Sequence, residues 1–299
     1  MPLRVIRERP TDRNKLSGLS GVLTFSVEVR EPVHIWGGMP YIEGLEELAA
    51  RIKEVGIEEI GEVEEGGEEI RDLMMIGGKP VIPGSSLKGA VRSRLELSFR
   101  EYNNLVPSCF SVTGPSENPS FIHREVYQSS AEDRGSPCDY NRYGTVCKVC
   151  DIFGAPGLAS RVYFSNIEFY KKEIDLNRKI FVIPRGSKSK GEVLFSGLEP
   201  YELGLVLIGM GNERPLLIGA GKYRYEMGRI LISPESWKFS KHSRRILSEI
   251  EVNFKENGHI LVDSDASKLW KRLVERAKRE YENYLLEEDF DARAKKVSH

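Results

Sequence analysis

The sequence has no apolar run long enough to cross a membrane. Its opening residues, MPLRVIRERP, contain no apolar core of the length that a secretory signal peptide needs. It also lacks the pattern G-x-x-x-x-G-K-S/T, which excludes an enzyme built on a nucleotide-binding P-loop. The net charge is only −1, because 44 Lys and Arg are balanced by 45 Asp and Glu. We therefore expect a cytoplasmic protein that could bind nucleic acid only by gathering its basic residues on one face.

What is present predicts a globular fold. The chain has 299 residues, of which 40% are hydrophobic and 30% charged, enough for one large domain or two small ones with a proper core. Apolar and polar side chains alternate over residues 21–30, which predicts a strand. Residues 268–286 predict a closing helix with an apolar stripe at four-residue spacing, packed either on the core or on a neighbouring subunit.

Cysteine is scarce but clustered. The sequence has four cysteines, and three of them follow the pattern C-x8-C-x2-C at Cys138, Cys147 and Cys150. In a cytoplasmic chain such a cluster indicates metal binding rather than disulfides. The Cys147–Cys150 pair can form a tight zinc knuckle, to which Cys138 adds a third thiolate. Either Cys109 or His123 would supply the fourth ligand, and a full set of protein ligands predicts a structural zinc ion. The alternative is a group of reduced cysteines that only pack.

The segment VIPGSSLKGAVRSRLE, residues 81–96, predicts a turn followed by a helix that Ser85 or Ser86 could cap. Lys88 and Arg92 lie off the apolar face of this helix. A helix N-terminus with serines and a nearby lysine is suited to binding an anion. The alternative is an ordinary capped surface helix. The apolar face, at four-residue spacing, consists of Leu87, Val91, Leu95 and Phe99.

Two further stretches combine basic residues with glycine or aromatic residues. In PLLIGAGKYRYEMGRILI, Gly219 and Gly221 precede Lys222 and Arg224, with tyrosines between the cations. Glycine allows close backbone approach, cations bind phosphate, and a tyrosine can stack on a base. In CKVCDIFGAPGLASRVYFSNIEF, Arg161 precedes a predicted strand and would contact either RNA phosphate or a surface carboxylate.

Candidate acid–base residues lie before the 81–96 segment. His34 follows the first strand, in PVHIWGG, and is expected to be packed or hydrogen-bonded because no paired base or nucleophile is nearby. Residues 58–72 hold seven glutamates and one aspartate, a composition typical of a solvated loop that repels phosphate. The aspartate, Asp72, ends this predicted loop just before a short apolar run.

Taken together, four stretches resemble the signature of the RAMP superfamily of CRISPR-associated proteins: the 81–96 segment, PVHIWGG after the first strand, the Cys-x-x-Cys segment with its Ser-Arg strand, and the glycine-rich stretch. The similarity is greatest to the RNA-binding backbone subunits of type III (Csm/Cmr-type) interference complexes. It implies an α+β fold with a ferredoxin-like, RRM-type core, an antiparallel sheet, large insertions and a zinc-tied loop region. The RAMP/RRM-like domain would span residues 1–265, with insertions at about 39–72 and 104–160, and a C-terminal helix and tail would follow at 266–299.

The resemblance also implies that the chain binds guide RNA and target RNA and assembles with other RAMP subunits. In catalytic family members an aspartate in a loop before the Pro-Gly-Ser-Ser turn cleaves target RNA. Asp72 is the best match, with Glu69 or Glu68 as alternatives. RNA carries its own nucleophile in the 2′-OH, so one carboxylate can assist, with or without a divalent ion such as magnesium. Contacts to RNA are expected from Ser85, Ser86, Lys88, Arg92, Arg161, Gly219, Gly221, Lys222 and Arg224.

Three other functions stay open at this point. A guide-processing endoribonuclease of the same superfamily would use His34 as its general base. An architectural subunit would bind RNA and its neighbours without cutting. A zinc-dependent hydrolase would need an open coordination position, which a metal with four protein ligands does not offer.

Overall fold

The protein is described by a computed structural model that covers residues 3–14, 17–41, 70–110, 134–223, 226–250, 254–257, 260–263 and 265–285. The longest strand is β2 (Leu19–Glu31). Successive side chains of a strand point to opposite faces, so the alternating sequence of β2 buries one face. The buried residues of that face are Leu23, Phe25, Val27 and Val29. The strand predicted over residues 21–30 is therefore confirmed.

A long antiparallel sheet is built around β2. Strand β12 (Lys188–Leu198) pairs with one side of β2, and β14 (Arg229–Ser240) with the other. The shorter strands are β8 (Val162–Phe164), β13 (Leu216–Leu217), β15 (Phe254–Asn257) and β16 (Ile260–Asp263). The sheet has the order β15-β16-β14-β2-β12-β8, with β13 beside β14, and its pairs are antiparallel.

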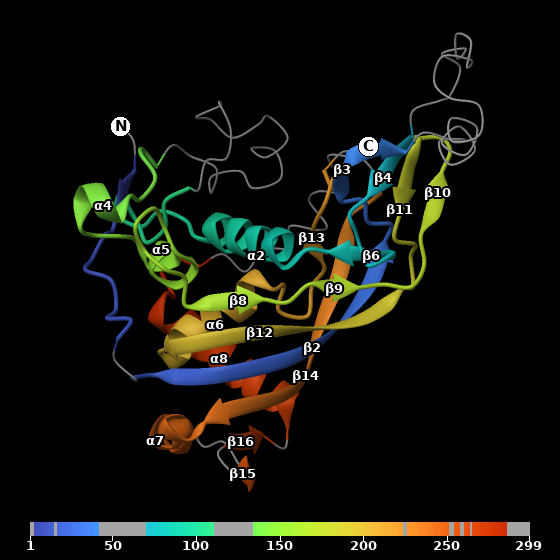
Figure 1. Ribbon diagram of the computed structural model, residues 1–299. Helices are drawn as coiled ribbons and strands as arrows, with labels where there is room; N and C mark the ends of the chain where they lie inside the picture. The colour runs from blue at the N-terminus through green and yellow to red at the C-terminus, as the bar shows by residue number, and fades with distance from the viewer. Residues whose placement is uncertain are drawn as a thin grey trace, which may run out of the picture.

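Helices α2 (Gly84–Ser98), α6 (Pro200–Gly209) and α8 (Ala266–Glu280) share one hydrophobic core with the buried face of the sheet (Figure 1). The fold is thus α+β with an antiparallel sheet, as predicted. The predicted stripe of α8 packs on the core of its own chain, with Leu273 and its neighbours buried. Helix α8 approaches α6 so closely that a Cβ atom on Gly204 would lie 2.1 Å from the carbonyl oxygen of Leu273, which requires glycine at this position.

The order of the central elements along the chain is β2, α2, β8, β12, α6 and β14, with smaller elements between them. In the sheet the four strands of this series lie in the order β14-β2-β12-β8. Two strand–helix–strand units therefore interleave in one antiparallel sheet, and their helices pack on the same core.

Two smaller sheets lie on the right-hand side of Figure 1, one at the upper right and the other beside the start of α2. Their strands are β3 (Trp36–Tyr41), β4 (Ile70–Leu73), β5 (Met75–Ile76), β6 (Lys79–Ile82), β9 (Ile167–Glu168), β10 (Glu173–Asp175) and β11 (Ile180–Val182). One sheet has the order β10-β11-β4-β3 and the other β5-β6-β9. Strands β3 and β4 pair with each other at the two ends of the predicted insertion at about 39–72. Residues 42–69 lie outside the described part of the chain.

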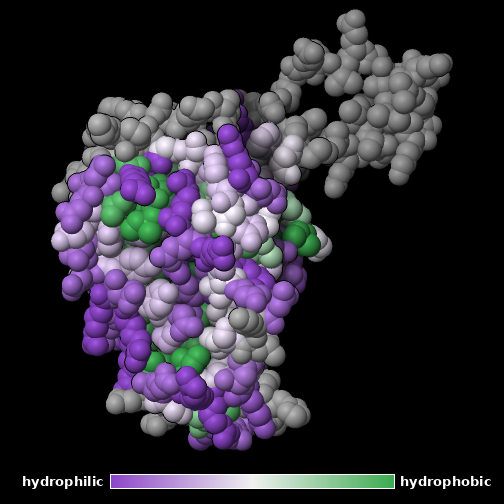
Figure 2. Space-filling model, turned by 90° about the vertical axis from the view of Figure 1, so that its left-hand side faces the viewer, coloured by the Kyte–Doolittle hydropathy of each residue, from purple (hydrophilic) through white to green (hydrophobic). Residues whose placement is uncertain are grey.

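The opposite end of the molecule carries the cysteine segment. Strand β7 (Leu105–Val106) pairs in parallel with β1 (Arg4–Val5), which brings the N-terminal segment to this end. Helices α4 (Tyr140–Tyr143) and α5 (Lys148–Phe153) lie beside it (Figure 1). The side that carries α4 is mostly hydrophilic, with small separate hydrophobic patches (Figure 2).

The chain after β14 continues through η3 (Lys241–Ser243) and α7 (Arg244–Glu249), and Ser243 hydrogen-bonds to Ser20 of β2. Within the described ranges, no helix combines the length and the apolar character that a membrane span requires.

Candidate nucleic-acid interface and metal centre

The four cysteines converge on one point. Cys109, Cys138, Cys147 and Cys150 are buried and free of disulfides, and their four Sγ atoms all lie within 4.8 Å of one another. The Sγ atom of Cys109 is 3.4 Å from that of Cys150 and 3.7 Å from that of Cys147. Tetrahedral thiolates about 2.3 Å from a zinc ion lie about 3.8 Å apart. The cluster can therefore bind a metal ion, and Cys109 is the fourth cysteine in it, whereas His123 lies outside the described residues.

Local structure explains how the cluster forms. Cys147 is the N-cap of α5 and Cys150 lies in its first turn, so the C-x2-C spacing places both sulfurs on the same side. The backbone N–H of Cys147 donates to the Cys138 sulfur at 3.2 Å, and that of Cys109 donates to the Cys147 sulfur at 3.4 Å. Hydrogen bonds from the neighbouring thiols and from this backbone N–H hold the pKa of Cys138 below its ordinary value. Such donors favour the thiolate of Cys138, whereas hydrogen bonds to the other cysteines raise the pKa of Cys109.

Two arginines also donate to the cluster. Arg7 Nε lies 3.3 Å from the sulfur of Cys138, and Arg92 Nη2 lies 3.1 Å from that of Cys150. Four thiolates around a divalent ion carry a net charge of −2, and the two guanidinium groups supply the opposite charge. This donor set fits a metal ion held entirely by sulfur.

Arg92 is consequently not available for the RNA contact predicted for it. Besides the Cys150 sulfur, it contacts Glu96 Oε1 at 2.7 Å and the carbonyl oxygen of Gly154 at 2.8 Å. Each of the three guanidinium nitrogens donates to one of these acceptors, and only 17% of the side chain is exposed. Arg92 joins α2 to the metal knuckle, and its assignment to RNA is corrected.

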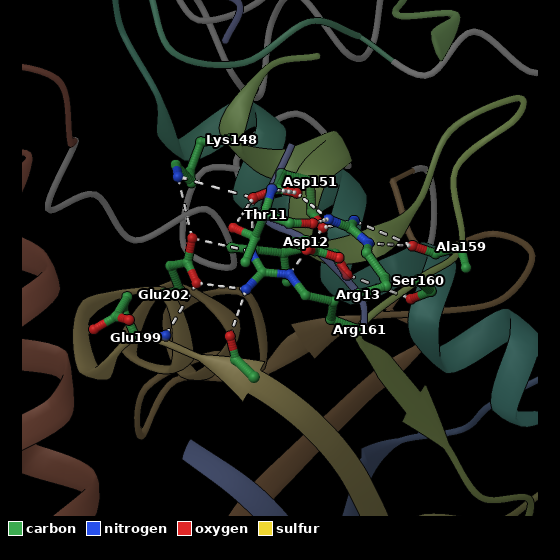
Figure 3. Close-up of polar contacts among 12 residues, drawn as sticks. Thr11, Asp12, Arg13, Lys148, Asp151, Ala159, Ser160, Arg161, Glu199 and Glu202 are labelled. Atoms are coloured by element: carbon green, nitrogen blue, oxygen red, sulfur yellow. Dashed lines mark hydrogen bonds and ion pairs between the residues drawn. The ribbon is translucent and has the colours of Figure 1, made fainter. Parts of the chain in front are cut away.

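The RNA contact predicted for Arg161 is also corrected, because this residue lies in a buried ion cluster (Figure 3). Its Nη1 contacts Glu202 Oε2 at 2.8 Å, and its Nη2 contacts Asp151 Oδ2 at 2.8 Å. Arg161 is 4% exposed, so RNA cannot reach it. The alternative prediction, a carboxylate partner, is correct in kind, although both carboxylates are buried rather than on the surface.

The ion cluster joins four segments of the chain. Arg13 Nη1 contacts Asp151 Oδ1 at 2.6 Å, and Lys148 Nζ contacts Glu202 Oε1 at 3.1 Å (Figure 3). Burial alone would raise the pKa of Asp151, but the charges of Arg161, Arg13 and Lys148 outweigh it and hold this pKa below its usual range. The N-terminal segment, α5, the start of β8 and α6 are thereby fixed to one another beside the cysteines.

Lys88 lies on the first turns of α2 and remains available. Its Nζ lies 5.5 Å from the centre of the Tyr163 ring. Burial, and then the charge of Arg92, lower the pKa of Lys88 from its ordinary value. In the part of the chain that the structure describes, no carboxylate lies within 4.0 Å of its Nζ. Ser85 is exposed and Ser86 partly exposed beside it, so contacts from these three residues to RNA stay a prediction.

The cap of α2 differs from the prediction. The N-cap residue is Pro83, and neither Ser85 nor Ser86 caps the helix. The N–H of Gly84 instead donates to Asn166 Oδ1 at 2.9 Å. A Cβ atom on Gly84 would lie 2.0 Å from the carbonyl oxygen of Phe164. The first turn of α2 is thus fixed against Phe164, the last residue of β8, and against Asn166, which follows β8.

The glycine-rich stretch lies beside α2. Lys222 and Tyr223 line a small hollow together with Ser93, Arg94 and neighbouring apolar residues. Burial lowers the pKa of Lys222, and an anion in the hollow would offset this effect. Arg224 lies outside the described residues.

The two glycines have φ angles of +81° at Gly219 and +75° at Gly221. A Cβ atom on Gly219 would lie 2.4 Å from the carbonyl oxygen of His34. Gly219 therefore allows a close approach to the backbone of His34, and not to RNA as was predicted. A contact from Gly221 or Lys222 to RNA stays a prediction.

The candidate acid–base residues lie elsewhere. His34 is 2% exposed, and its Nδ1 lies 2.8 Å from the carbonyl oxygen of Phe181, so it is the packed, hydrogen-bonded histidine that was expected. Asp72 lies within strand β4, not in a loop, and this part of the prediction is wrong. Its Oδ1 accepts from the N–H of Leu73 at 2.7 Å and contacts Lys172 Nζ at 3.2 Å. Glu68 and Glu69 lie outside the described residues.

Several residues of these sites were missed by sequence reasoning. Arg7, Arg13 and Asn166 each contact a partner more than 80 residues away along the chain, so no local pattern indicates them. Glu202 had a local signal: its carboxylate accepts from the N–H of Glu199, and this spacing after a strand is typical of a capping box. Tyr163 lies in the strand predicted after Arg161, and its exposure beside Lys88 has no local sequence signal.

Comparison with known proteins adds a family match. A family model described as the RAMP superfamily matches residues 26–261. A search of curated proteins found no match. Among solved structures, one described as the Csm3–Csm4 subcomplex in the type III-A CRISPR-Cas interference complex is 17% identical, with 86% of this chain and 97% of that chain covered and a TM-score of 0.37. Csc2 of Thermofilum pendens is 12% identical, with 96% and 90% covered and a TM-score of 0.41. The family assignment rests on the match over residues 26–261.

Proposed function

Because the chain belongs to the RAMP superfamily, we propose that it is an RNA-binding subunit of a type III CRISPR effector complex, assembled with other RAMP subunits along a guide RNA. Guide–target pairing would read the sequence, and this chain would hold the RNA through its backbone. The observation that carries the proposal is Lys88, a cation on the first turns of α2 with no carboxylate partner among the described residues.

Two features support this site. The N-terminal end of a 15-residue helix favours an anion, and Lys88 adds a full charge there. On the same helix, the hollow lined by Lys222 offers a second basic position. Two phosphates of one RNA strand could therefore be held along α2. We also propose a ferredoxin-like core, which the interleaved order β14-β2-β12-β8 supports.

The RNA-binding proposal is tested with Lys88→Ala. The affinity for single-stranded RNA should fall regardless of base sequence, and the slope of log affinity against log salt should decrease by about 0.7 for one lost phosphate contact. Lys79→Ala is the matched control, because Lys79 is also a lysine near an exposed tyrosine but contacts Glu168 at 2.7 Å. An unchanged slope in Lys88→Ala would contradict the proposal.

We propose that the metal is zinc and that it is structural, held by Cys109, Cys138, Cys147 and Cys150. Four thiolates are a soft donor set that suits zinc, and their buried position leaves no open coordination site for a substrate. The zinc would tie the segment before β8 to α2 and to the N-terminal segment. A zinc-dependent hydrolase is disfavoured for the same reason.

Cleavage of target RNA by Asp72 is proposed as a separate activity of the assembled complex, with or without magnesium. The alternative is an architectural subunit, which the contacts of Asp72 favour, because its Oδ1 already accepts from the N–H of Leu73 and contacts Lys172 Nζ. The two alternatives differ in one measurable property, the cleavage rate of a bound target.

A further inference from the structure

An exposed tyrosine stands beside Lys88 on the outer face of the main sheet. Tyr163 is the central residue of β8, with its neighbours Val162 and Phe164 turned towards the core. Across the sheet it lies opposite Leu194 of β12, which in turn lies opposite Val22 of β2. Tyr163 is 53% exposed and Leu194 46% exposed. Together they form a small aromatic and apolar surface next to a cation.

The position of this ring is fixed by the way α2 meets β8. Gly84 holds the first turn of the helix at the end of β8 through two contacts. It packs against the backbone of Phe164, and its N–H donates to Asn166 Oδ1. Lys88, one turn later, then brings its Nζ to 5.5 Å from the ring of Tyr163. The ammonium group and the aromatic ring therefore have a set separation on rigid elements.

We propose that Tyr163 is a stacking platform for one base of single-stranded RNA. The base would stack on the ring face away from Lys88, which lies over the ring and would bind the adjacent phosphate. The inference rests on the RNA-binding function proposed above and adds a base contact to it. Bases of a single strand expose their faces to aromatic side chains, whereas bases in a duplex are already stacked. Stacking accepts any base, so Tyr163 would strengthen binding without reading the sequence.

Charge favours RNA over a protein as the occupant of this surface. Lys88 has no carboxylate within ion-pair distance among the described residues, which suits it to a phosphate brought by the ligand. Tyr170 provides a contrast within the same chain. It is 83% exposed with Lys79 Nζ 5.3 Å from its ring, but Lys79 is already paired with Glu168. The Glu168 carboxylate would repel a phosphate at that second tyrosine.

The experiment uses the full, metal-containing chain and two labelled probes: a short oligouridine, and a ribose–phosphate strand of equal length without bases. For the oligouridine, Tyr163→Ala should weaken binding by about 5- to 150-fold, the range for loss of one base–aromatic stack. Tyr163→Phe, which keeps the ring, and Tyr170→Ala should bind like the parent protein. On the strand without bases, Tyr163→Ala and the parent protein should have equal affinity. Thermal unfolding of each variant checks that the fold is kept, as expected for an exposed side chain.

Two results would overturn the inference. Tyr163→Phe could lose as much affinity as Tyr163→Ala, which would assign the effect to the hydroxyl. Tyr163→Ala could instead bind the oligouridine as tightly as the parent, and if it then lost assembly with other RAMP subunits, the surface would be a protein interface. If Lys88→Ala weakens RNA binding and Tyr163→Ala does not, only the stacking inference fails. If the parent protein binds neither probe, the proposed function itself fails.

Discussion

Arg92 illustrates at the scale of one residue what the sequence could and could not predict. Its position on the polar side of a helix was read correctly from the four-residue spacing of α2. Its partners were not, because Cys150 and Gly154 lie 58 and 62 residues further along the chain. The local pattern assigns this cation to solvent or phosphate, but it contacts acceptors within the protein. Arg161 is a second example, because it forms ion pairs with Asp151 and Glu202.

A prediction about the metal follows from the contact between Arg92 and Cys150. Partners that hydrogen-bond to metal ligands typically contribute 10- to 100-fold to metal affinity, so Arg92→Met should speed the release of zinc to a chelating dye by about tenfold or more. Lys88→Met is the control, because Lys88 lies one turn earlier on the same helix without a contact to sulfur. The parent should release one zinc ion per chain. Equal release kinetics for Arg92→Met and the parent would show that the arginine does not support the metal.

At the scale of the element, α2 was predictable along its length but not at its start. Leu87, Val91, Leu95 and Phe99 are completely buried, as their spacing predicts, because helix periodicity is a local property. The cap depends on which distant residue lies over the first turn. The serines at the second and third helical positions are plausible caps from the local sequence. The acceptor of the Gly84 N–H is instead Asn166, 82 residues away.

The cap gives a prediction for stability. Asn166→Ala removes the acceptor of the Gly84 N–H and should lower the free energy of unfolding by about 1 kcal/mol, the typical value for a lost cap. Ser85→Ala should change it little, because the exposed Ser85 side chain does not cap the helix. Urea unfolding of the two variants and the parent measures the difference. A larger loss in Ser85→Ala than in Asn166→Ala would contradict the cap seen here.

At the scale of the whole molecule, the chain has two differently built ends joined by α2 and the main sheet. One end holds the cysteine cluster and the buried ion cluster, which together fix the N-terminal segment, α5 and α6 (Figure 3). The other end holds the sheet of β3, β4, β10 and β11 (Figure 1). The α+β class and the antiparallel sheet were predictable from alternation and from the family resemblance. The small sheet was not, because β4 and β11 pair in parallel across more than 100 residues.

Asp72 belongs to this small sheet, and its proposed activity requires the assembled complex. Strand β4 leads through β5 and β6 directly into Pro83 and α2, so Asp72 is connected to the proposed phosphate site by a short, paired stretch of chain. Asp72 is paired with Lys172, whose Nζ lies 3.2 Å from its Oδ1. A phosphate of the bound RNA would compete for Lys172 and release the carboxylate to accept the proton of a 2′-OH. Asp72 is therefore held in a paired strand instead of the predicted loop, and bound RNA would free its carboxylate by taking over Lys172.

The corresponding experiment compares two aspartates of the same sheet in the complex assembled on guide RNA. Asp72→Asn should leave guide and target binding intact and slow target cleavage by about 100-fold or more, the usual contribution of a general base. Asp175→Asn is the matched control, because Asp175 of β10 is also paired with a cation, Arg178. A complex with Asp175→Asn should cleave the target at the parental rate. Equal cleavage by Asp72→Asn and the parent would contradict a catalytic role. The ion pair with Lys172 would then be a structural contact between β4 and the loop before β10, and the subunit would hold RNA without cutting it.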